Sequence, residues 1–509
     1  MTGPLLLSGR GLTLEDVEAV ACGAGANVSL SDEARAGVEA SRAVIDEALA
    51  RGRTVYGVNT GFGALSDAVI APDQIRVLQV NLLRSHAAGV GAPLDAPATR
   101  AILLLRANTL AAGASGVRPE LVDGLLALLR HDLLPRIPRY GSVGASGDLA
   151  PLAHAALPLI GEGVVRTHDG WEPAADALER AGLRPLELEA KEGLALINGT
   201  QVHTAIGVLA LLAAERAVDA AEVTGALSLD GLRGTPEAFD AAIQDARPHP
   251  GQRVSAARLR GLLAGSEIRE SHRSDDPRVQ DAYSLRCMPQ VHGASRQLLG
   301  YARDVLAVEV NSATDNPLVF ADTGRILSGG NFHGQIVAQA LDLIPIACAD
   351  LAAISERRIA RLVDPAMSGL PAFLTESPGL SSGLMMIQIG AAAMVAEVRR
   401  LAVPASVDTI PTDNNKEDHV SMGVGAALKA ARAVEFLETV LAMELLVACQ
   451  ALDFLAPLRT GVAAERARSA LRAKVPRLDE DRPLEPDIAA SEALVRDGVL
   501  SGIARSVGL

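Results

Sequence analysis

Apolar residues recur at helical spacing through most of the chain. After Ser31, a capping residue type, the residues Ala34, Val38, Ile45 and Leu49 form one apolar face. The same spacing predicts further helices at residues 73–91, 98–113, 119–130, 148–160, 201–230, 289–310, 332–362, 380–402 and 416–452. Long Ala/Leu helices need partners on more than one side, so the pattern predicts an all-α helix bundle that forms an oligomer.

The pattern is interrupted in three places. Residues 51–67 contain consecutive turn signals and predict a loop, and the polar residues 245–285 predict a second surface loop region. The stretch PLLLSG near the N-terminus predicts a short strand. We expect an N-terminal helical domain, 1–200, and a segment, 201–509, of long central helices and C-terminal helices.

Composition agrees with a helical core. Of the 509 residues, 49% are apolar but only 2% are aromatic, so the core must be built from Ala, Leu and Val. These residues favour close-packed helices, whereas strands draw on aromatic and β-branched side chains.

Charge and cysteine usage exclude several classes of protein. The formal net charge of -14 argues against a nucleic acid or an anionic membrane as partner. The four cysteines are far apart, so we predict neither a disulfide framework nor a metal site. Apolar runs such as AIGVLALLAA (205–214) are too short to span a bilayer, and the N-terminus lacks a signal-peptide pattern. We expect a soluble cytoplasmic protein.

The stretch GSVGASGDLAPL (141–152) is unusual for a helix-rich chain. It is either a plain turn with Asp148 as the N-cap of the next helix, or a reactive backbone. The nitrogen of Gly147 is sterically unshielded, and glycine permits unusual dihedral angles. If that nitrogen meets the carbonyl carbon of Ala145, a five-membered ring can close. Loss of water from the ring and from Ser146 then leaves a methylidene group conjugated to an imidazolone, which is a strong electrophile.

This stretch resembles the cofactor loop of the histidine and aromatic amino-acid ammonia-lyases, in which Ala-Ser-Gly cyclises to methylidene-imidazolone (MIO). Further blocks that resemble the family follow in the same order: YGVNTGFG (56–63), RSHAAGVG (84–91), KEGLALINGTQ (191–201), RPHPGQ (247–252), VQDAYSLRC (279–287), SATDNPLVF (312–320), SGGNFHG (328–334) and EDHVSMG (417–423). The resemblance implies an all-α fold with minor short strands near the N-terminus. It also implies a homotetramer whose active sites are shared between chains, with MIO from Ala145-Ser146-Gly147 and no external cofactor.

The resemblance also implies roles for single residues in removing ammonia from an amino acid. Tyr56 is similar to the family base that removes a proton from Cβ, and its phenol pKa of about 10 would have to be lowered or coupled. Tyr283 is similar to the second family tyrosine, and Arg286 to a clamp for the substrate carboxylate. The residues implied to contact the substrate or MIO, or to assist ring closure, are Asn198, Gln280, Phe332, Met385 and Asp148.

Two positions bear on the substrate. Glu417 resembles a glutamate of the lyases that act on histidine, where a carboxylate holds the imidazole by a charge-assisted hydrogen bond. Ser85-His86 matches the same group, so the resemblance implies elimination of ammonia from histidine to give trans-urocanate, the entry to histidine degradation. The alternatives are a tyrosine or phenylalanine lyase or aminomutase with the same cofactor, and a non-catalytic helical scaffold.

The chain departs from the commonest family residues at several positions. Gln335 stands where many members have Glu, and NFHGQ also occurs in tyrosine aminomutases, which share the Ser-His pair. The other departures are Ala282, Met288, His203, His292 and Lys416.

Overall fold

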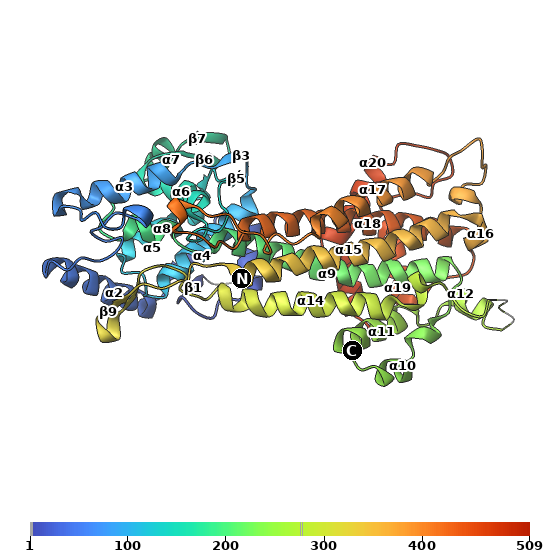
Figure 1. Cartoon of the computed structure of the whole chain (residues 1–509). Coiled ribbons are helices and arrows are strands. Elements are labelled where there is room, and N and C mark those ends of the chain that lie inside the picture. Colours follow the sequence, from blue (N-terminus) through green and yellow to red (C-terminus); the bar gives the residue numbers. More distant parts are fainter. Residues whose placement is uncertain (1–3, 275, 277, 509) are drawn as a thin grey trace. The chain divides into compact units, whose positions relative to one another are not determined.

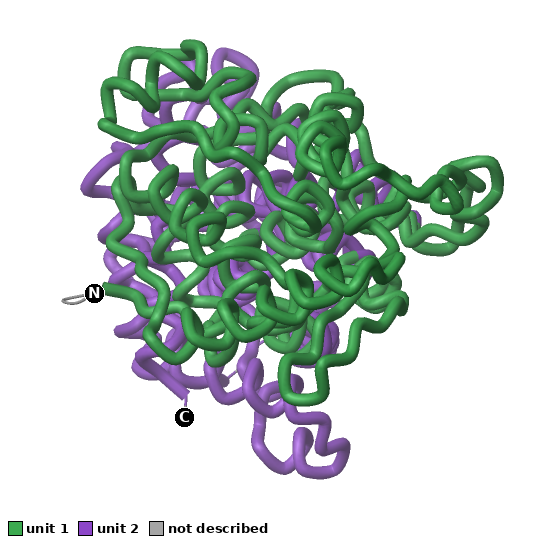
Figure 2. Tube along the Cα trace, turned by 90° about the vertical axis from the view of Figure 1, so that its left-hand side faces the viewer, with its two compact units in different colours: residues 1–209, 303–341, 404–428 green, residues 210–302, 342–403, 429–509 purple. Residues whose placement is uncertain are grey.

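The computed structural model describes residues 4–274, 276 and 278–508. Their contacts divide the chain into two compact units. Unit 1 comprises residues 1–209, 303–341 and 404–428, and unit 2 comprises 210–302, 342–403 and 429–509 (Figure 2). Both units are therefore discontinuous in sequence. The sequence predicts two continuous domains that meet at residue 200. The two compact units have other boundaries and do not test that division, which stays a prediction.

Helices dominate both units, as the apolar spacing predicts (Figure 1). Unit 1 contains α1 (Leu14–Cys22), α2 (Asp32–Ala50), α3 (Ile75–His86), α4 (Ala96–Ala111), α5 (Pro119–Arg130), α6 (Leu149–Ala156), α7 (Ala174–Arg180) and α8 (Glu192–Ile197). Unit 2 contains α10 (Ala241–Ala246), α11 (Pro250–Leu263), α12 (Glu267–Ser271), α13 (Tyr283–Arg286), α16 (Pro365–Ser368), α17 (Met385–Leu401), α19 (Val462–Arg472), α20 (Glu485–Arg496) and α21 (Val499–Arg505). The long helices with residues in both units are α9 (Gln201–Gly231), α14 (Met288–Glu309), α15 (Gln335–Val363) and α18 (Gly423–Asp453).

Short strands pair at the periphery of unit 1. They are β1 (Leu5–Leu7), β2 (Val28–Leu30), β3 (Val90–Pro93), β4 (Leu134–Pro135), β5 (Pro138–Tyr140), β6 (Val164–Thr167), β7 (Gly170–Pro173), β8 (Leu318–Phe320) and β9 (Arg325–Leu327). β1 and β2 are parallel, whereas β3–β5, β4–β6–β7 and β8–β9 are antiparallel. The β3–β5 pair leads into the glycine-rich loop that precedes α6.

Local sequence explains where the N-terminal helices begin. Thr13 and Asp16 form a capping box at the start of α1, and Ser31 accepts a hydrogen bond from the backbone N–H of Ala34 at the start of α2. α4 begins at Asp95, whose side chain accepts from the Ala98 N–H, and almost all of its residues are buried. Because α4 is buried on every side, although it carries polar residues such as Arg106 and Asn108, it belongs to the core of unit 1.

The prediction of a loop region at 245–285 is wrong where α11 (Pro250–Leu263) and the short α12 (Glu267–Ser271) lie. The buried face of α11 includes Gln252, Ser255 and Arg258 besides its leucines. Since polar residues occupy part of the buried face, the apolar spacing that marks a helix is incomplete there.

Several helix boundaries also differ from the prediction. α3 ends at His86, where the C-cap Ala87 leaves the helical conformation, and residues up to Gly91 belong to the connection and to β3. α18 begins only at Gly423. Residues 416–422 instead form the loop that carries Glu417. This loop is part of the candidate site.

α15 differs from the other described helices in the length of its apolar sequence. Among the described residues it is the helix long and apolar enough to cross a membrane, contrary to the expectation that the apolar runs are too short. However, 61% of its apolar window is buried, as in the core helix of a soluble protein.

Candidate active site

The loop before α6 has a backbone that favours glycine. Gly144 and Gly147 have φ of +84° and +83°, and Ser146 has a φ of +51°. A Cβ on Gly147 would lie 2.2 Å from the carbonyl oxygen of Gly199. A side chain at position 147 would therefore meet rigid backbone, and glycine is the residue that fits.

Residues distant in sequence hold Ser146. Its hydroxyl donates to Oε1 of Glu417 at 2.6 Å, and its carbonyl oxygen accepts from Nδ2 of Asn198 at 2.9 Å. The other oxygen of Glu417, Oε2, accepts from the hydroxyl of Thr412 at 2.8 Å. Glu417 and Asn198, both predicted site residues, thus converge on Ser146.

Asp148 is fully buried and caps a different helix from the one predicted. It occupies the N-cap position of α6, but its side chain makes no capping hydrogen bond there. Instead Oδ2 accepts from the backbone N–H groups of Val202 and His203, both at 2.9 Å, at the start of α9. Oδ1 lies 2.9 Å from Nδ1 of His203. The interpretation of Asp148 as the side-chain cap of α6 is therefore wrong.

Tyr56 lies in the loop 51–67, and its hydroxyl accepts from the backbone N–H of Gly63 at 3.2 Å. Burial raises the phenol pKa; the Gly63 hydrogen bond opposes this, and the negative charges of Glu417 and Asp413 add to it. The net direction is upward. A role of Tyr56 as base requires a lowered or coupled phenol pKa. Burial and the charges of Glu417 and Asp413 raise this pKa instead.

His86 ends α3, with Nδ1 2.9 Å from the carbonyl oxygen of Leu82. Burial lowers its pKa, while the hydrogen bond to Leu82 and the charges of Glu417 and Asp413 oppose the shift. Glu417 thus acts electrostatically on both Tyr56 and His86. The structure thus places Tyr56 and His86 within electrostatic range of Glu417, which itself binds Ser146.

Phe332 lies before α15, and its side chain is partly buried. The next residue, His333, stacks on His419 with ring centroids 5.8 Å apart, and its Nε2 lies 3.2 Å from the carbonyl oxygen of His419. This stack joins the segment of Phe332 to the loop of Glu417. The sequence offered no signal for it beyond two histidines inside family blocks.

The remaining predicted site residues belong to unit 2. Gln280 is exposed, the Tyr283 side chain is 70% exposed, and the guanidinium carbon of Arg286 lies 4.6 Å from the Tyr283 ring centroid. Nε of Arg286 is buried and has no hydrogen-bond partner among the described residues. Met385 is partly buried at the first turn of α17. The structure brings Tyr283 and Arg286 together, and the described contacts do not join Met385 to them.

Sequence reasoning missed the residues that support the site. Thr412 binds Glu417, and Asp413 accepts from the backbone N–H of Ala64 at 2.9 Å, which ties the Glu417 loop to the Tyr56 loop. His203 stood out only as a departure from the family. The pairing Thr412–Glu417 and the approach of Asp413 depend on tertiary structure, so neither has a local signal.

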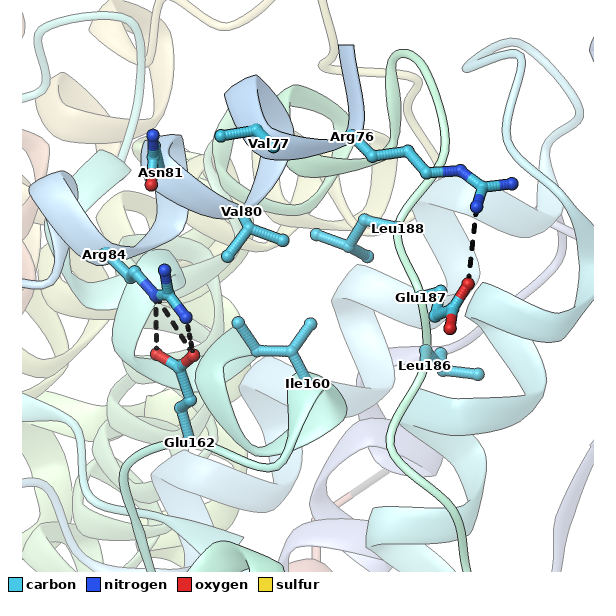
Figure 3. Close-up of a pocket in the computed structure, with 10 residues that line it drawn as sticks. All are labelled: Arg76, Val77, Val80, Asn81, Arg84, Ile160, Glu162, Leu186, Glu187 and Leu188. Carbon is cyan, nitrogen blue, oxygen red and sulfur yellow. Dashed lines mark hydrogen bonds and ion pairs between the residues drawn. The ribbon is translucent and has the colours of Figure 1, made fainter. Parts of the chain in front are cut away.

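A separate pocket of about 370 Å³ lies in unit 1 between α3 and residues 186–188 (Figure 3). Figure 3 shows Arg84 paired with Glu162 and Arg76 paired with Glu187 at its sides. None of the predicted site residues lines this pocket. It is therefore distinct from the candidate active site.

Comparison with known proteins assigns this helical fold to a class of enzymes that break carbon–nitrogen bonds. The chain belongs to the aromatic amino acid lyase family, which matches residues 12–473, and it is a carbon–nitrogen lyase. It is 55% identical to a histidine ammonia-lyase of Anaeromyxobacter sp. (strain K) over 504 residues, which cover 97% of this chain and 99% of the relative. It is 53% identical to that of Myxococcus xanthus, with coverage of 99% and 98%.

Solved structures share the fold over nearly the whole chain. Histidine ammonia-lyase from Trypanosoma cruzi superposes with a TM-score of 0.92 at 43% identity, covering 99% of this chain and 95% of that one. Tyrosine aminomutase from Streptomyces globisporus superposes with a TM-score of 0.93 at 39% identity, covering 99% of both chains. The all-α fold class predicted from the sequence is confirmed.

Proposed function

We propose that this lyase eliminates ammonia from L-histidine to give trans-urocanate, the first step of histidine degradation. The observation that carries the proposal is the position of Glu417. Its carboxylate lies between Ser146 and Thr412 and acts electrostatically on Tyr56 and His86. A carboxylate is a strong hydrogen-bond acceptor for an imidazole N–H and offers a phenyl ring nothing. The relatives named histidine ammonia-lyase at 53–55% identity support the same substrate.

We infer that Ala145, Ser146 and Gly147 cyclise to MIO. The loop fits the ring, because position 147 has no space for a Cβ, Ala145 is small, and Ser146 already has a positive φ. The ring would supply an electrophile that turns the substrate amine into a better leaving group. Asn198 and Glu417 would hold it from the sides on which they now bind Ser146.

The other roles fall to side chains of this chain. Tyr56 would remove the proton from Cβ of the substrate, and the positive charge of the bound amino acid would favour its phenolate. Arg286, whose buried Nε is unpaired among the described residues, would bind the substrate carboxylate. The remaining residues would line the substrate site, and they are His86, Gln280, Tyr283, Phe332 and Met385.

We propose a homotetramer in which each active site draws on several chains. The segment that carries Gln280, Tyr283 and Arg286 is exposed, with Val279 97% exposed and Tyr283 70% exposed. Exposed apolar and aromatic side chains close together favour an interface. The net charge of -14 agrees with a cytoplasmic enzyme that binds neither nucleic acid nor membrane.

A second candidate is a tyrosine or phenylalanine lyase or aminomutase with the same cofactor. Gln335 follows NFHG as in the tyrosine aminomutases, and the tyrosine aminomutase structure is as similar in fold as that of the histidine enzyme. The Ser-His pair does not separate the two groups. The substrate must therefore be measured.

Ultraviolet absorbance separates the candidates. The purified protein is incubated with L-histidine, L-tyrosine and L-phenylalanine in turn, with Ser146→Ala as the blank. We expect absorbance of urocanate with histidine alone. Coumarate or cinnamate without urocanate would overturn the histidine assignment in favour of the second candidate, and β-amino acid products would identify an aminomutase.

A further inference from the structure

The buried pair of Asp148 and His203 has no role in the proposed function so far. Both side chains are fully buried, and Oδ1 of Asp148 lies 2.9 Å from Nδ1 of His203. The imidazole is confined by two glycines. A Cβ on Gly334 would lie 2.5 Å from Nε2, and a Cβ on Gly423 would lie 2.9 Å from Nδ1. The backbone at both glycines therefore lies close against the ring, and Nδ1 faces Asp148.

Both the backbone N–H and the imidazole of His203 contact the carboxylate of Asp148. Oδ2 accepts from the backbone N–H groups of Val202 and His203, and Oδ1 is paired with the imidazole. The backbone N–H of Asp148 donates to the carbonyl oxygen of Gly199 at 2.7 Å. Asp148 is bonded directly to Gly147, so these contacts fix one end of the Ala-Ser-Gly segment.

Charge supports the pair. Burial lowers the pKa of His203, but the carboxylate of Asp148, by charge and by hydrogen bond, and the charge of Glu309 outweigh burial and raise it. Protonated His203 would neutralise the buried carboxylate of Asp148. Without an Nδ1–H donor, Oδ1 would be left buried and unpaired, a state that costs far more than the hydrogen bond itself contributes.

We propose that His203 is a positioning residue for formation of the cofactor: through Asp148, it holds Gly147 where its nitrogen reaches the carbonyl carbon of Ala145. This inference rests on the cyclisation in the proposed function. The new bond joins Gly147 N to Ala145 C, and the Gly147 N–H proton passes to the Ala145 oxygen. The hydroxyl formed on the Ala145 carbon then leaves as water together with the Ser146 N–H proton. The Ser146 side-chain hydroxyl and the Ser146 Cα hydrogen leave as the second water, so no oxidant is needed.

The test follows the intact mass of freshly synthesised protein with time. Cyclisation removes the mass of two water molecules, so the fraction of chains that have lost it measures maturation independently of activity. The variants are His203→Leu, which removes the donor, and His203→Asn, whose amide nitrogen lies near the position of Nδ1 and donates. The matched control is His292→Leu, because His292 is also fully buried, yet both its ring nitrogens lack hydrogen-bond partners among the described residues.

We expect His203→Leu to mature at least tenfold more slowly, His203→Asn to recover most of the rate, and His292→Leu to match the wild type. A merely structural role would not be rescued by Asn. A folded His203→Leu, judged by circular dichroism, that matures at the wild-type rate would overturn the proposal.

If His203→Leu does not fold, Gly334→Ala is tested in its place. The added Cβ displaces the imidazole of His203 without removing this side chain. Slow maturation of Gly334→Ala supports the proposal, and the wild-type rate contradicts it. A wild-type protein that keeps its full mass would instead refute the cyclisation on which the inference depends, so the two failures are distinguishable.

Discussion

The glycine-rich loop of unit 1 and the Tyr283 segment of unit 2 differ in how their residues are held. In the loop, Ser146 and Asp148 form hydrogen bonds with four residues distant in sequence, which are Glu417, Asn198, Val202 and His203, and Asp148 is fully buried. In the segment, Tyr283 is 70% exposed and contacts Arg286. The loop is therefore organised within one chain, whereas the segment depends on what covers it in the proposed tetramer.

The two regions also differ in backbone strain, which is present at Ser146 in the loop. Positive φ at a non-glycine residue such as Ser146 costs on the order of 1–3 kcal/mol, and it persists only where surrounding contacts fix it. A neutral hydrogen bond contributes about 0.5–1.5 kcal/mol and one to a charged group about 1.5–3 kcal/mol, so the bonds to Asn198 and to the Glu417 carboxylate are enough to offset that cost. Tyr283 and Arg286 have no positive φ, so the segment that carries them has no such strain.

Removing the hydroxyl of the loop gives the largest expected effect. Ser146→Ala cannot form the methylidene group, so turnover should fall by several orders of magnitude. Before cyclisation the Ser146 hydroxyl donates to Glu417, but the ring no longer carries that hydroxyl, so the free energy of unfolding of the variant should differ from that of the mature protein by less than about 2 kcal/mol. Steady-state rates and urea unfolding measure both. Wild-type turnover would refute the cofactor assignment.

Gly147→Ala tests whether the loop tolerates any side chain. The new Cβ would lie 2.2 Å from the carbonyl oxygen of Gly199, so maturation measured by intact mass should fail. Gly182→Ala is the matched control, because Gly182 has a φ of +69° but no atom within 4 Å of a Cβ. The control should lose about 1 kcal/mol of unfolding free energy and mature normally. Equal behaviour of the two variants would show that the loop is not sterically constrained.

Arg286→Lys probes the exposed segment. Lysine keeps the charge but loses the two-pronged geometry, so KM should rise about 10- to 100-fold, which corresponds to about 1.4–2.8 kcal/mol. Stability should change little, in contrast to Gly147→Ala. The exposed Arg273→Lys serves as control for charge-preserving replacement in the same unit. An unchanged KM would remove Arg286 from the substrate site.

The smallest effect concerns pH. The charge of Asp413 raises the pKa of Tyr56, so removing it should lower that pKa. Since Tyr56 is proposed to act as the phenolate, the rate rises with pH through this pKa. The ascending limb of kcat/KM should therefore move to lower pH by a fraction of a unit in Asp413→Asn and stay in place in Asp73→Asn. A shift to higher pH would contradict the role of Tyr56 as base.

Local signals predicted much of the fold. The spacing at 119–130 and 201–230 anticipated α5 and α9 almost to the residue, because proline at N1 or continuous apolar sequence marks such helices. α11 was missed because Gln252 and Arg258 occupy its buried face. The helical class was thus readable, whereas a helix with a polar buried face was not.

Fewer features of the candidate site than of the fold could be predicted from the sequence. Family resemblance, and not spacing, pointed to Glu417 and Asn198, and the structure then brought both to Ser146. Asp148 occupies the predicted N-cap position of α6, but spacing could not show that its carboxylate binds the start of α9 instead of the first turn of α6. The role inferred for His203 likewise depends on a contact between segments that the sequence separates.

The most direct test of the account is the intact mass of the freshly purified wild-type protein. If residues 145–147 close into the ring, the mass is lower than that of the sequence by two water molecules. An active preparation with the full mass of an unmodified chain would contradict the central claim.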